Sequence, residues 1–278
     1  MGYDHAIADY DQYVKLAPND PDGFNNRGHA YMEKGEYDRT IDDFNTALKL
    51  KPDHDLATYN RGVAESDKRQ YALAVEGYTR YIALKPSDPD GYDSRGNAYR
   101  REGQFEQAIA DYNHALQLNR GYVFLDRGNA HFLAGQTSAA RADFRLAIGA
   151  DPSLVHAALW LHLVKERLHE DDTEDLRAIA GKADLSVWPG PVLKLYRGES
   201  TDNDVMIAAG NSDPQIQKQQ VCEADFYTAE NALLHQQRAT ALTRLHAARD
   251  GCPKDYIEYA AALAELKRVS ASPAAPAK

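Results

Sequence analysis

A repeat of 34 residues dominates the first half of the chain. Gly28, Gly62 and Gly96 each follow an arginine and stand two residues before an alanine, and the same pattern returns once more at Gly128. A fixed period of this length is typical of helical solenoids, in which every repeat is a pair of helices that packs against its neighbours. The pattern therefore predicts an all-α fold of stacked helix pairs, an architecture that provides binding surfaces.

Small and aromatic residues keep constant places within each repeat. In the first complete repeat these residues are Phe24, Gly28, Tyr31, Phe44, Ala47 and Pro52. Small side chains let two helices approach closely, aromatic rings fill the remaining space, and proline ends the second helix. The pattern closely resembles the tetratricopeptide repeat. This resemblance implies a right-handed superhelical solenoid of antiparallel helix pairs, with four repeats over residues 21–152.

Residues 1–20 resemble the second helix of a repeat whose first helix is missing. The matching positions are Tyr3, Ala6, Ile7, Tyr10, Tyr13 and Pro18. A helix of this kind leaves apolar side chains uncovered, at a cost of about 1.5 to 3 kcal/mol for each large one. We therefore expect either that the chain begins inside a longer parent sequence or that a second copy caps the open end.

An arginine and an aspartate also recur once in most repeats. The arginines are Arg27, Arg61, Arg95 and Arg127, and the aspartates are Asp9, Asp43, Asp111 and Asp143, with Gly77 taking the place of an aspartate. We interpret these residues as a structural ladder of ion pairs. Each arginine stem would cover apolar surface while its guanidinium group meets a carboxylate on the neighbouring helix.

The repeat pattern weakens after the fourth repeat, and residues 153–221 form a degenerate helical region. The spacing of apolar residues predicts helices at 154–168 and, more weakly or over shorter stretches, near 173–183, 192–196 and 202–210. Residues 222–269 return to the repeat pattern as a C-terminal helix pair. Residues 270–278 are rich in Ala, Ser and Pro, a composition that predicts a disordered tail.

The two cysteines flank this final helix pair. Cys222 lies at the start of its first helix and Cys252 lies just beyond its second helix. Because antiparallel helices bring those two ends together, we predict a disulfide, which would stabilise the fold by roughly 3 to 4 kcal/mol. Disulfides persist in oxidising compartments, so the pair favours an exported protein. The alternative interpretation is two unrelated thiols.

The second half resembles the NlpI-type tetratricopeptide lipoproteins of bacteria. The likeness lies in residues 158–161, 188–198, 223–227 and 258–259. Proteins of that family are exported, are anchored to the envelope by a lipid, dimerise, and act as adaptors for cell-wall hydrolases and a processing protease. The resemblance implies a homodimeric adaptor that is periplasmic or envelope-associated if the parent protein has an export leader. A chain that is complete as given would be cytoplasmic.

In a solenoid of this type, residues of each first helix that point away from the second helix line a concave groove. We predict that the groove binds an extended segment of a partner protein. The predicted binding residues are Asn26, His29, Tyr59, Asn60, Asp93, Asn97, Arg100, Asp126 and Asn129. An asparagine amide can both donate to and accept from a peptide backbone, so these amides suit an extended segment of any sequence. The alternative is that the asparagines only cap helices or face water.

Acidic side chains outnumber basic ones in the predicted groove. The acids are Asp22, Asp90, Asp93 and Asp126, against the single base Arg100. A site for an acidic C-terminal tail, as in co-chaperones, needs lysines and arginines at such positions. The groove therefore favours a neutral or basic segment, and a cytoplasmic interaction module or co-chaperone is the alternative function.

The net charge of −10, from 42 acidic and 32 basic residues, argues against a nucleic-acid partner, which would need a basic face. No apolar run reaches the 18 or more residues that predict a transmembrane helix. The sequence also contains no motif with the spacing of a phosphate loop or a catalytic triad. We therefore predict a non-catalytic protein without a cofactor.

One group of residues has the composition of a metal site. His162, Glu166 and His169 are spaced to lie on one helix face, with Asp171 and Asp172 just beyond. This spacing is common on exposed helices, so we interpret the group as a solvated face and predict no metal. A metal protein or an enzyme built on these residues is the remote alternative.

Overall fold

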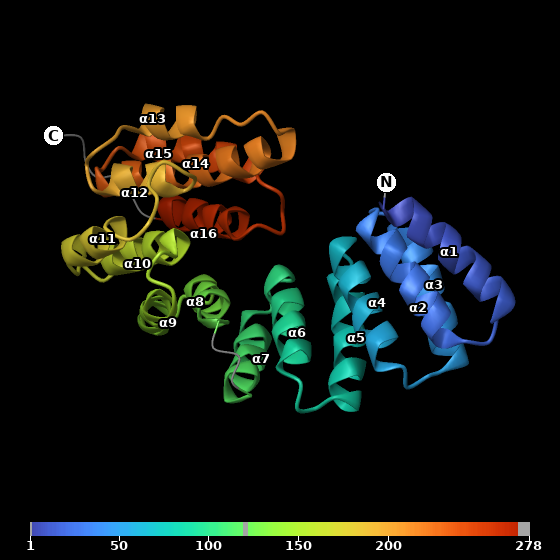
Figure 1. Cartoon of the computed structure of the whole chain (residues 1–278). Helices are drawn as coiled ribbons and strands as arrows, with labels where there is room; N and C mark the ends of the chain where they lie inside the picture. Colours follow the sequence, from blue (N-terminus) through green and yellow to red (C-terminus); the bar gives the residue numbers. More distant parts are fainter. Residues whose placement is uncertain (1, 119–121, 272–278) are drawn as a thin grey trace. The chain divides into compact units, whose positions relative to one another are not determined.

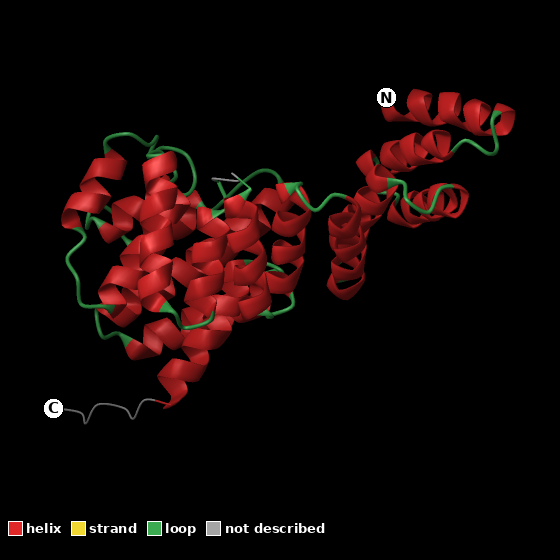
Figure 2. Ribbon diagram, turned by 90° about the horizontal axis from the view of Figure 1, so that it is seen from below, coloured by secondary structure: helices red, strands yellow, loops and turns green. Residues whose placement is uncertain are grey.

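The computed structural model describes residues 2–118 and 122–271. Within those ranges the chain forms sixteen helices and no strand, which confirms the predicted all-α fold. The chain divides into two compact units, residues 1–123 and 124–278. Figure 1 labels the helices of both units, and Figure 2 shows the chain coloured by secondary structure.

Unit 1 is a stack of helix pairs that follows one leading helix (Figure 1). Its helices are α1 (Gly2–Leu16), α2 (Pro21–Glu33), α3 (Tyr37–Leu50), α4 (Asp55–Asp67), α5 (Tyr71–Leu84), α6 (Pro89–Arg101) and α7 (Phe105–Gln117). Helix α2 packs on α3, α4 on α5, and α6 on α7, and each pair contacts the next along the chain. This arrangement is the solenoid that the 34-residue period predicts.

The recurring glycine lies where the two helices of a pair touch. A Cβ atom on Gly28 would lie 2.9 Å from the ring of Phe44, and a Cβ atom on Gly96 would lie 2.9 Å from the ring of Tyr112. Both rings are completely buried. A glycine is therefore required, because an aromatic ring of the second helix rests directly on the backbone of the first.

The predicted ladder of arginine and aspartate is present in unit 1. Arg27 donates two hydrogen bonds to Asp43, at 2.8 and 2.7 Å. Arg95 donates two to Asp111, at 2.7 and 2.8 Å. Both carboxylates are almost fully buried, at 5% and 4% exposure. Such bidentate pairs fix the orientation of one helix on the other, and they confirm a structural role for the arginines.

The second repeat replaces this ion pair with a different one. Gly77 stands where the aspartate would be, and a Cβ atom there would lie only 3.2 Å from the Cα atom of Gly62. Arg61 meets Glu65 instead, one turn further along the same helix, at 3.4 Å. Glu65 is 7% exposed, and burial raises the pKa of its carboxyl. The two unusual residues of this repeat therefore compensate for each other.

Helix α1 packs on α2 and leaves apolar side chains exposed, as predicted. Leu16 is 85% exposed, Tyr3 48% and Tyr13 44%. Asp9, which the sequence pattern assigned to the ladder, is exposed and makes no ladder pair. The first ladder arginine instead donates to Asp11 at 2.8 Å.

Unit 2 contains the fourth repeat and the C-terminal half of the chain. Its helices are α8 (Phe124–Leu133), α9 (Thr137–Ala150), α10 (Val155–Arg167), α11 (Thr173–Ala180), α12 (Gly190–Tyr196), α13 (Asp202–Ala208), α14 (Pro214–Leu234), α15 (Arg238–Gly251) and α16 (Ile257–Ala271). Helix α14 starts before the position predicted at Cys222. The reason is that Asp213 caps the helix and proline is its first residue.

Helix α16 adds a third helix to the predicted C-terminal pair, and it packs on α14 and α15. Ser270 and Ala271 end this helix. The predicted disordered tail at 270–278 therefore starts too early. Residues 272–278 lie outside the described residues.

Trp160 of α10 is the centre of the core of unit 2. It is 1% exposed, and its ring lies 4.9 Å from that of Phe132 and 5.5 Å from that of Phe226, measured between centroids. The core thus joins the fourth repeat to α14. Cys222 and Cys252 border the same core and form a disulfide, with a Cα–Cα distance of 4.9 Å.

A buried carboxylate connects three segments of unit 2. Glu223 of α14 accepts a hydrogen bond from the indole of Trp188 at 2.8 Å and lies 3.2 Å from His156 Nε2. Burial alone would lower the pKa of His156, but the hydrogen bond and charge of Glu223 outweigh it and raise that pKa above 6.5. Burial would raise the pKa of Glu223, but its partners lower it below 4.5.

These shifts predict how the ion pair changes stability with pH. His156 contributes stability that is fully present below pH 6.5 and is lost as the pH rises through its raised pKa. Glu223 contributes stability above pH 4.5 that is lost as the pH falls through its lowered pKa. The free energies of unfolding of the wild type and of His156→Gln, measured with urea, should differ most between pH 4.5 and pH 6.5. A difference that grows in alkaline buffer would contradict the assignment.

The glycine contacts predict opposite effects for two glycine substitutions in the same helix pair. A Cβ atom on Gly128 would lie 2.7 Å from the ring of Phe144, so Gly128→Ala should destabilise the protein by about 1 to 3 kcal/mol. A Cβ atom on Gly149 would meet nothing within 4 Å, so Gly149→Ala should stabilise it by up to about 1 kcal/mol. Urea unfolding measures the change in the free energy of unfolding for each variant. Equal changes for the two variants would show that packing on Phe144 is not the reason for the glycine at position 128.

Candidate functional site

The candidate site lies in unit 1, on the first helices of the three repeats. Helix α2 contacts α4, and α4 contacts α6, so their inner residues lie beside one another. We call these residues the inner polar row: Asn25, Asn26, Tyr59, Asn60, Asp93, Ser94 and Asn97. Hydrogen bonds connect members of the row both within a helix and between neighbouring helices.

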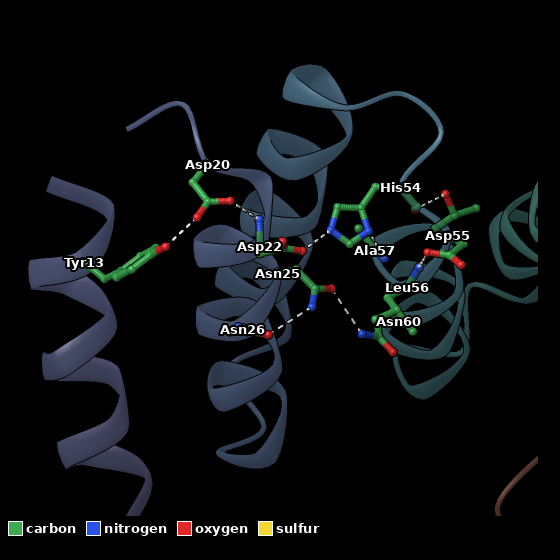
Figure 3. Close-up of polar contacts among 11 residues, drawn as sticks. Tyr13, Asp20, Asp22, Asn25, Asn26, His54, Asp55, Leu56, Ala57 and Asn60 are labelled. Atoms are coloured by element: carbon green, nitrogen blue, oxygen red, sulfur yellow. Dashed lines mark hydrogen bonds and ion pairs between the residues drawn. The ribbon is translucent and has the colours of Figure 1, made fainter. Parts of the chain in front are cut away.

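Three asparagine amides form a chain between α2 and α4 (Figure 3). Asn60 Nδ2 donates to Asn25 Oδ1 at 3.2 Å, and Asn25 Nδ2 donates to Asn26 Oδ1 at 3.2 Å. Asn25 is 5% exposed, Asn60 is partly exposed and Asn26 is exposed. Asn26 Nδ2 and Asn60 Oδ1 have no partner among the described residues. One donor and one acceptor therefore remain available to a ligand.

An apolar side chain lies on the same face as these amides. Leu56 is 56% exposed in the first turn of α4, one turn before Asn60. Residues four apart on a helix are neighbours on its surface. Figure 3 shows Leu56 and Asn60 on this helix. The face therefore combines amide groups with a side chain that can make an apolar contact.

His54 connects the two helices at the edge of the same face (Figure 3). It is the N-cap residue of α4, where its ring accepts from Ala57 N, and its Nε2 lies 2.9 Å from Asp22 Oδ1. His54 is 3% exposed, whereas the side chain of Asp22 is 73% exposed. Sequence reasoning did not include His54. The sequence could have indicated it, because His54 occupies the N-cap position that an aspartate holds in the neighbouring repeats.

The α4–α6 part of the row is hydrogen-bonded within the protein. Tyr59 Oη lies 2.9 Å from Ser94 Oγ. Asn97 donates to Asp93 at 3.1 Å and accepts from Tyr112 at 3.0 Å. The amide of Asn97 therefore supports its own repeat, and it lies one turn beyond Ser94, which is the residue equivalent to Asn60.

The inner polar row contains one aspartate, Asp93, and Asp90 lies one turn before it on α6. Asp93 is 8% exposed and accepts the bond from Asn97. Burial raises the pKa of the Asp90 carboxyl, and the nearby charge of Asp88 adds to the increase. Arg100 is the basic member of the predicted site, and it donates to Asn97 at 3.3 Å.

The predicted site residues are divided between the two units. His29 is exposed on α2, in unit 1. Asp126 and Asn129 belong to α8, in unit 2. Asn129 is only 6% exposed, and its side-chain oxygen is buried without a hydrogen-bond partner. The available surface is therefore centred on α2 and α4.

Two further properties bear on function. Among the described residues, one group of His, Cys, Asp and Glu side chains lies close enough together to hold a metal ion: His162, Glu166 and Asp172, in unit 2. His169, which the sequence pattern included, is not a member. In the part of the chain that the structure describes, we find no helix with the length and apolar character of a membrane span.

Comparison with known proteins identifies the repeat. The tetratricopeptide repeat family model matches residues 21–54 and 94–122. MamA from Desulfovibrio magneticus RS-1, from its residue 41 onward, is 25% identical with a TM-score of 0.52, over 55% of this chain and 87% of that chain.

Two more distant structures share the fold alone. A tetratricopeptide repeat protein from Parabacteroides merdae ATCC 43184 is 15% identical with a TM-score of 0.62, over 91% of this chain and 99% of that chain. YrrB, described as having an unusual peptide-binding site, is 16% identical with a TM-score of 0.56, over 69% and 98%. The finer resemblance to NlpI-type lipoproteins stays a prediction.

Proposed function

The chain is a tetratricopeptide repeat protein, and from this we propose that it is a non-catalytic scaffold that binds an extended segment of a partner protein. The segment would lie on the inner face of α2 and α4. The observation that supports this site is the amide chain of Asn60, Asn25 and Asn26, which ends in an unpaired acceptor and an unpaired donor.

The chemistry of these two groups suits a peptide backbone. A backbone offers one N–H donor and one C=O acceptor per residue. Asn60 Oδ1 can accept from such an N–H, and Asn26 Nδ2 can donate to such a carbonyl. Asn25 is buried and bonded to both, so it holds the two amides in position before a ligand arrives. Exposed Leu56 provides the apolar contact for a side chain of the ligand.

The charge of the face favours a neutral or basic segment. Asp22 is largely exposed beside the amide chain, and among the described residues its carboxylate meets the imidazole of His54 alone. An acidic ligand would be repelled here, whereas a lysine or arginine side chain would be attracted. The fold of YrrB supports the general idea, because a stack of this kind has a peptide-binding site in that protein.

We also propose a compartment and a class of partner. The disulfide between Cys222 and Cys252 supports a periplasmic or envelope location, since such bonds persist where the surroundings are oxidising. The proposal that the partners are cell-wall hydrolases or a processing protease, and that the protein is a homodimer, rests on the resemblance to NlpI-type lipoproteins. A cytoplasmic interaction module or co-chaperone is the alternative.

Selection from a random library of linear peptides tests the binding site. Neutral and basic peptides should be enriched, and fluorescence polarisation should give a weaker affinity for Asn26→Ala and for Asn60→Ala. Each variant removes about 1 kcal/mol of net hydrogen bonding, which is roughly a fivefold increase in Kd. The control is Gln107→Ala, which removes an exposed amide from α7, the second helix of its pair. Enrichment of acidic peptides, or equal effects of all three variants, would refute the site.

Thiol trapping tests the compartment separately. Cells that express the protein are treated with a thiol-blocking reagent before lysis, and the labelled cysteines are counted by mass spectrometry. We expect neither Cys222 nor Cys252 to be labelled, because the disulfide should already be present. Labelling of both residues would contradict an envelope location and favour the cytoplasmic alternative, while leaving the peptide-binding proposal intact.

A further inference from the structure

A polar cavity of about 450 Å³ lies in unit 2, well away in sequence from the inner polar row. Residues at the end of α10, the start of α11 and the end of α12 line it, among them His162, Glu166, Asp172, Tyr196 and Arg197. The cavity is not part of the proposed peptide site. Its composition therefore requires a separate explanation.

Three potential metal ligands meet in this cavity. One ligand atom from each of His162, Glu166 and Asp172 lies within 4.8 Å of the others. His162 and Glu166 are one turn apart on α10, and Asp172 comes from the residue directly before α11. The cluster therefore joins two helices, which distinguishes it from a chance alignment on a single exposed helix face.

Asp172 contacts His162 instead of capping helix α11. It occupies the N-cap position of α11, where an aspartate normally accepts a hydrogen bond from the backbone of the helix. Its side chain makes no such bond, and its Oδ2 lies 2.5 Å from His162 Nδ1 instead. Asp171, and not Asp172, accepts a hydrogen bond from a backbone N–H at the start of α11, that of Thr173, at 3.1 Å.

His162 is held rigidly but is not fully hydrogen-bonded. It is 5% exposed, and the ring of Tyr196 lies over it with a centroid distance of 4.2 Å. Its Nε2 is buried and has no hydrogen-bond partner. A buried polar atom without a partner is unusual, since its desolvation is uncompensated. This unpaired nitrogen lies on the opposite edge of the ring from Asp172, so Nδ1, which faces Asp172, is the nitrogen that would bind an ion together with that carboxylate.

The basic groups around the cavity are already paired with other acids. Lys165 meets Asp175 at 2.7 Å. Arg197 meets Glu199 at 2.7 Å. Arg177 similarly pairs with its own helix neighbour, at 2.5 Å. No lysine or arginine among the described residues is thus paired with Glu166 or Asp172, and the cluster keeps an excess of negative charge.

We propose that His162, Glu166 and Asp172 bind one divalent transition-metal ion, for which Zn²⁺ is the probe. One imidazole nitrogen and two carboxylates are ligands that Zn²⁺ accepts, and a water molecule can fill the fourth place of a tetrahedral site. The imidazole favours Zn²⁺ over Mg²⁺ and Ca²⁺, which prefer oxygen ligands. The ion would balance the two carboxylates and tether α10 to α11.

Zinc titration of the purified full-length protein tests the proposal. After removal of metals with a chelator, the protein competes with a chromophoric zinc indicator in the presence of excess Mg²⁺. The wild type should bind one Zn²⁺ per chain. Glu166→Gln should weaken that binding at least about tenfold, as the loss of a ligand does. This variant is suitable because the side chain of Glu166 has no partner among the described residues, so its replacement should not disturb the fold.

His169→Ala is the matched control, because His169 is an exposed histidine near the cluster that is not part of it. It should leave the zinc affinity unchanged. Zinc should also raise the melting temperature of the wild type and of His169→Ala, but not that of Glu166→Gln. The proposal is wrong if the wild type takes up no zinc, if Glu166→Gln binds as tightly as the wild type, or if His169→Ala loses the site. The first result would leave the hydrogen bond between His162 and Asp172 as the whole role of the cluster.

Discussion

The contact between an aromatic ring and a glycine backbone determines the geometry of every repeat. Phe44 rests on Gly28, and Tyr112 rests on Gly96, so close that no Cβ atom would fit between ring and helix. This contact sets the distance between the two helices of a pair. The bidentate pairs of Arg27 and Arg95 then fix their orientation. Because each pair has the same shape, the first helices of successive repeats lie beside one another.

The regular stack gives a surface whose repeats differ in chemistry. Asn97 is bonded to Asp93 and Tyr112 within its own repeat, and it stabilises that repeat. Asn60 bonds across to α2 and keeps a free acceptor. The same scaffold thus uses one amide as a structural group and leaves another with an unpaired acceptor. In the function that we propose, the free donor and the free acceptor are held in place by a buried third amide, and such preorganisation reduces the entropy lost on binding.

Some features could be predicted because they depend on residues at fixed spacing. The ladder follows from Arg95 and Asp111, which lie 16 positions apart and meet whenever two helices form a hairpin. Other features could not be predicted. The sequence predicts the same role for Asn97 and Asn60, although Asn97 lies one turn further along its helix, because sequence position does not tell which amide is already bonded within the protein. The third member of the cluster that we propose as a metal site is Asp172 and not His169, because the loop after α10 reverses the chain and brings the aspartate back to His162.

The sequence by itself determined the helical solenoid and the helix pairs of the repeats. It also determined that the two cysteines lie at adjacent ends of one helix pair, where they can form a disulfide. These features depend on the periodicity of the sequence and on the sizes of side chains, and they follow from contacts between residues that are close together in the chain. Only the tertiary structure decided which polar groups remain unpaired. A hydrogen bond such as that from Asn60 to Asn25 joins residues 35 positions apart. Whether a donor or an acceptor is left for a ligand therefore depends on how separate helices lie against one another.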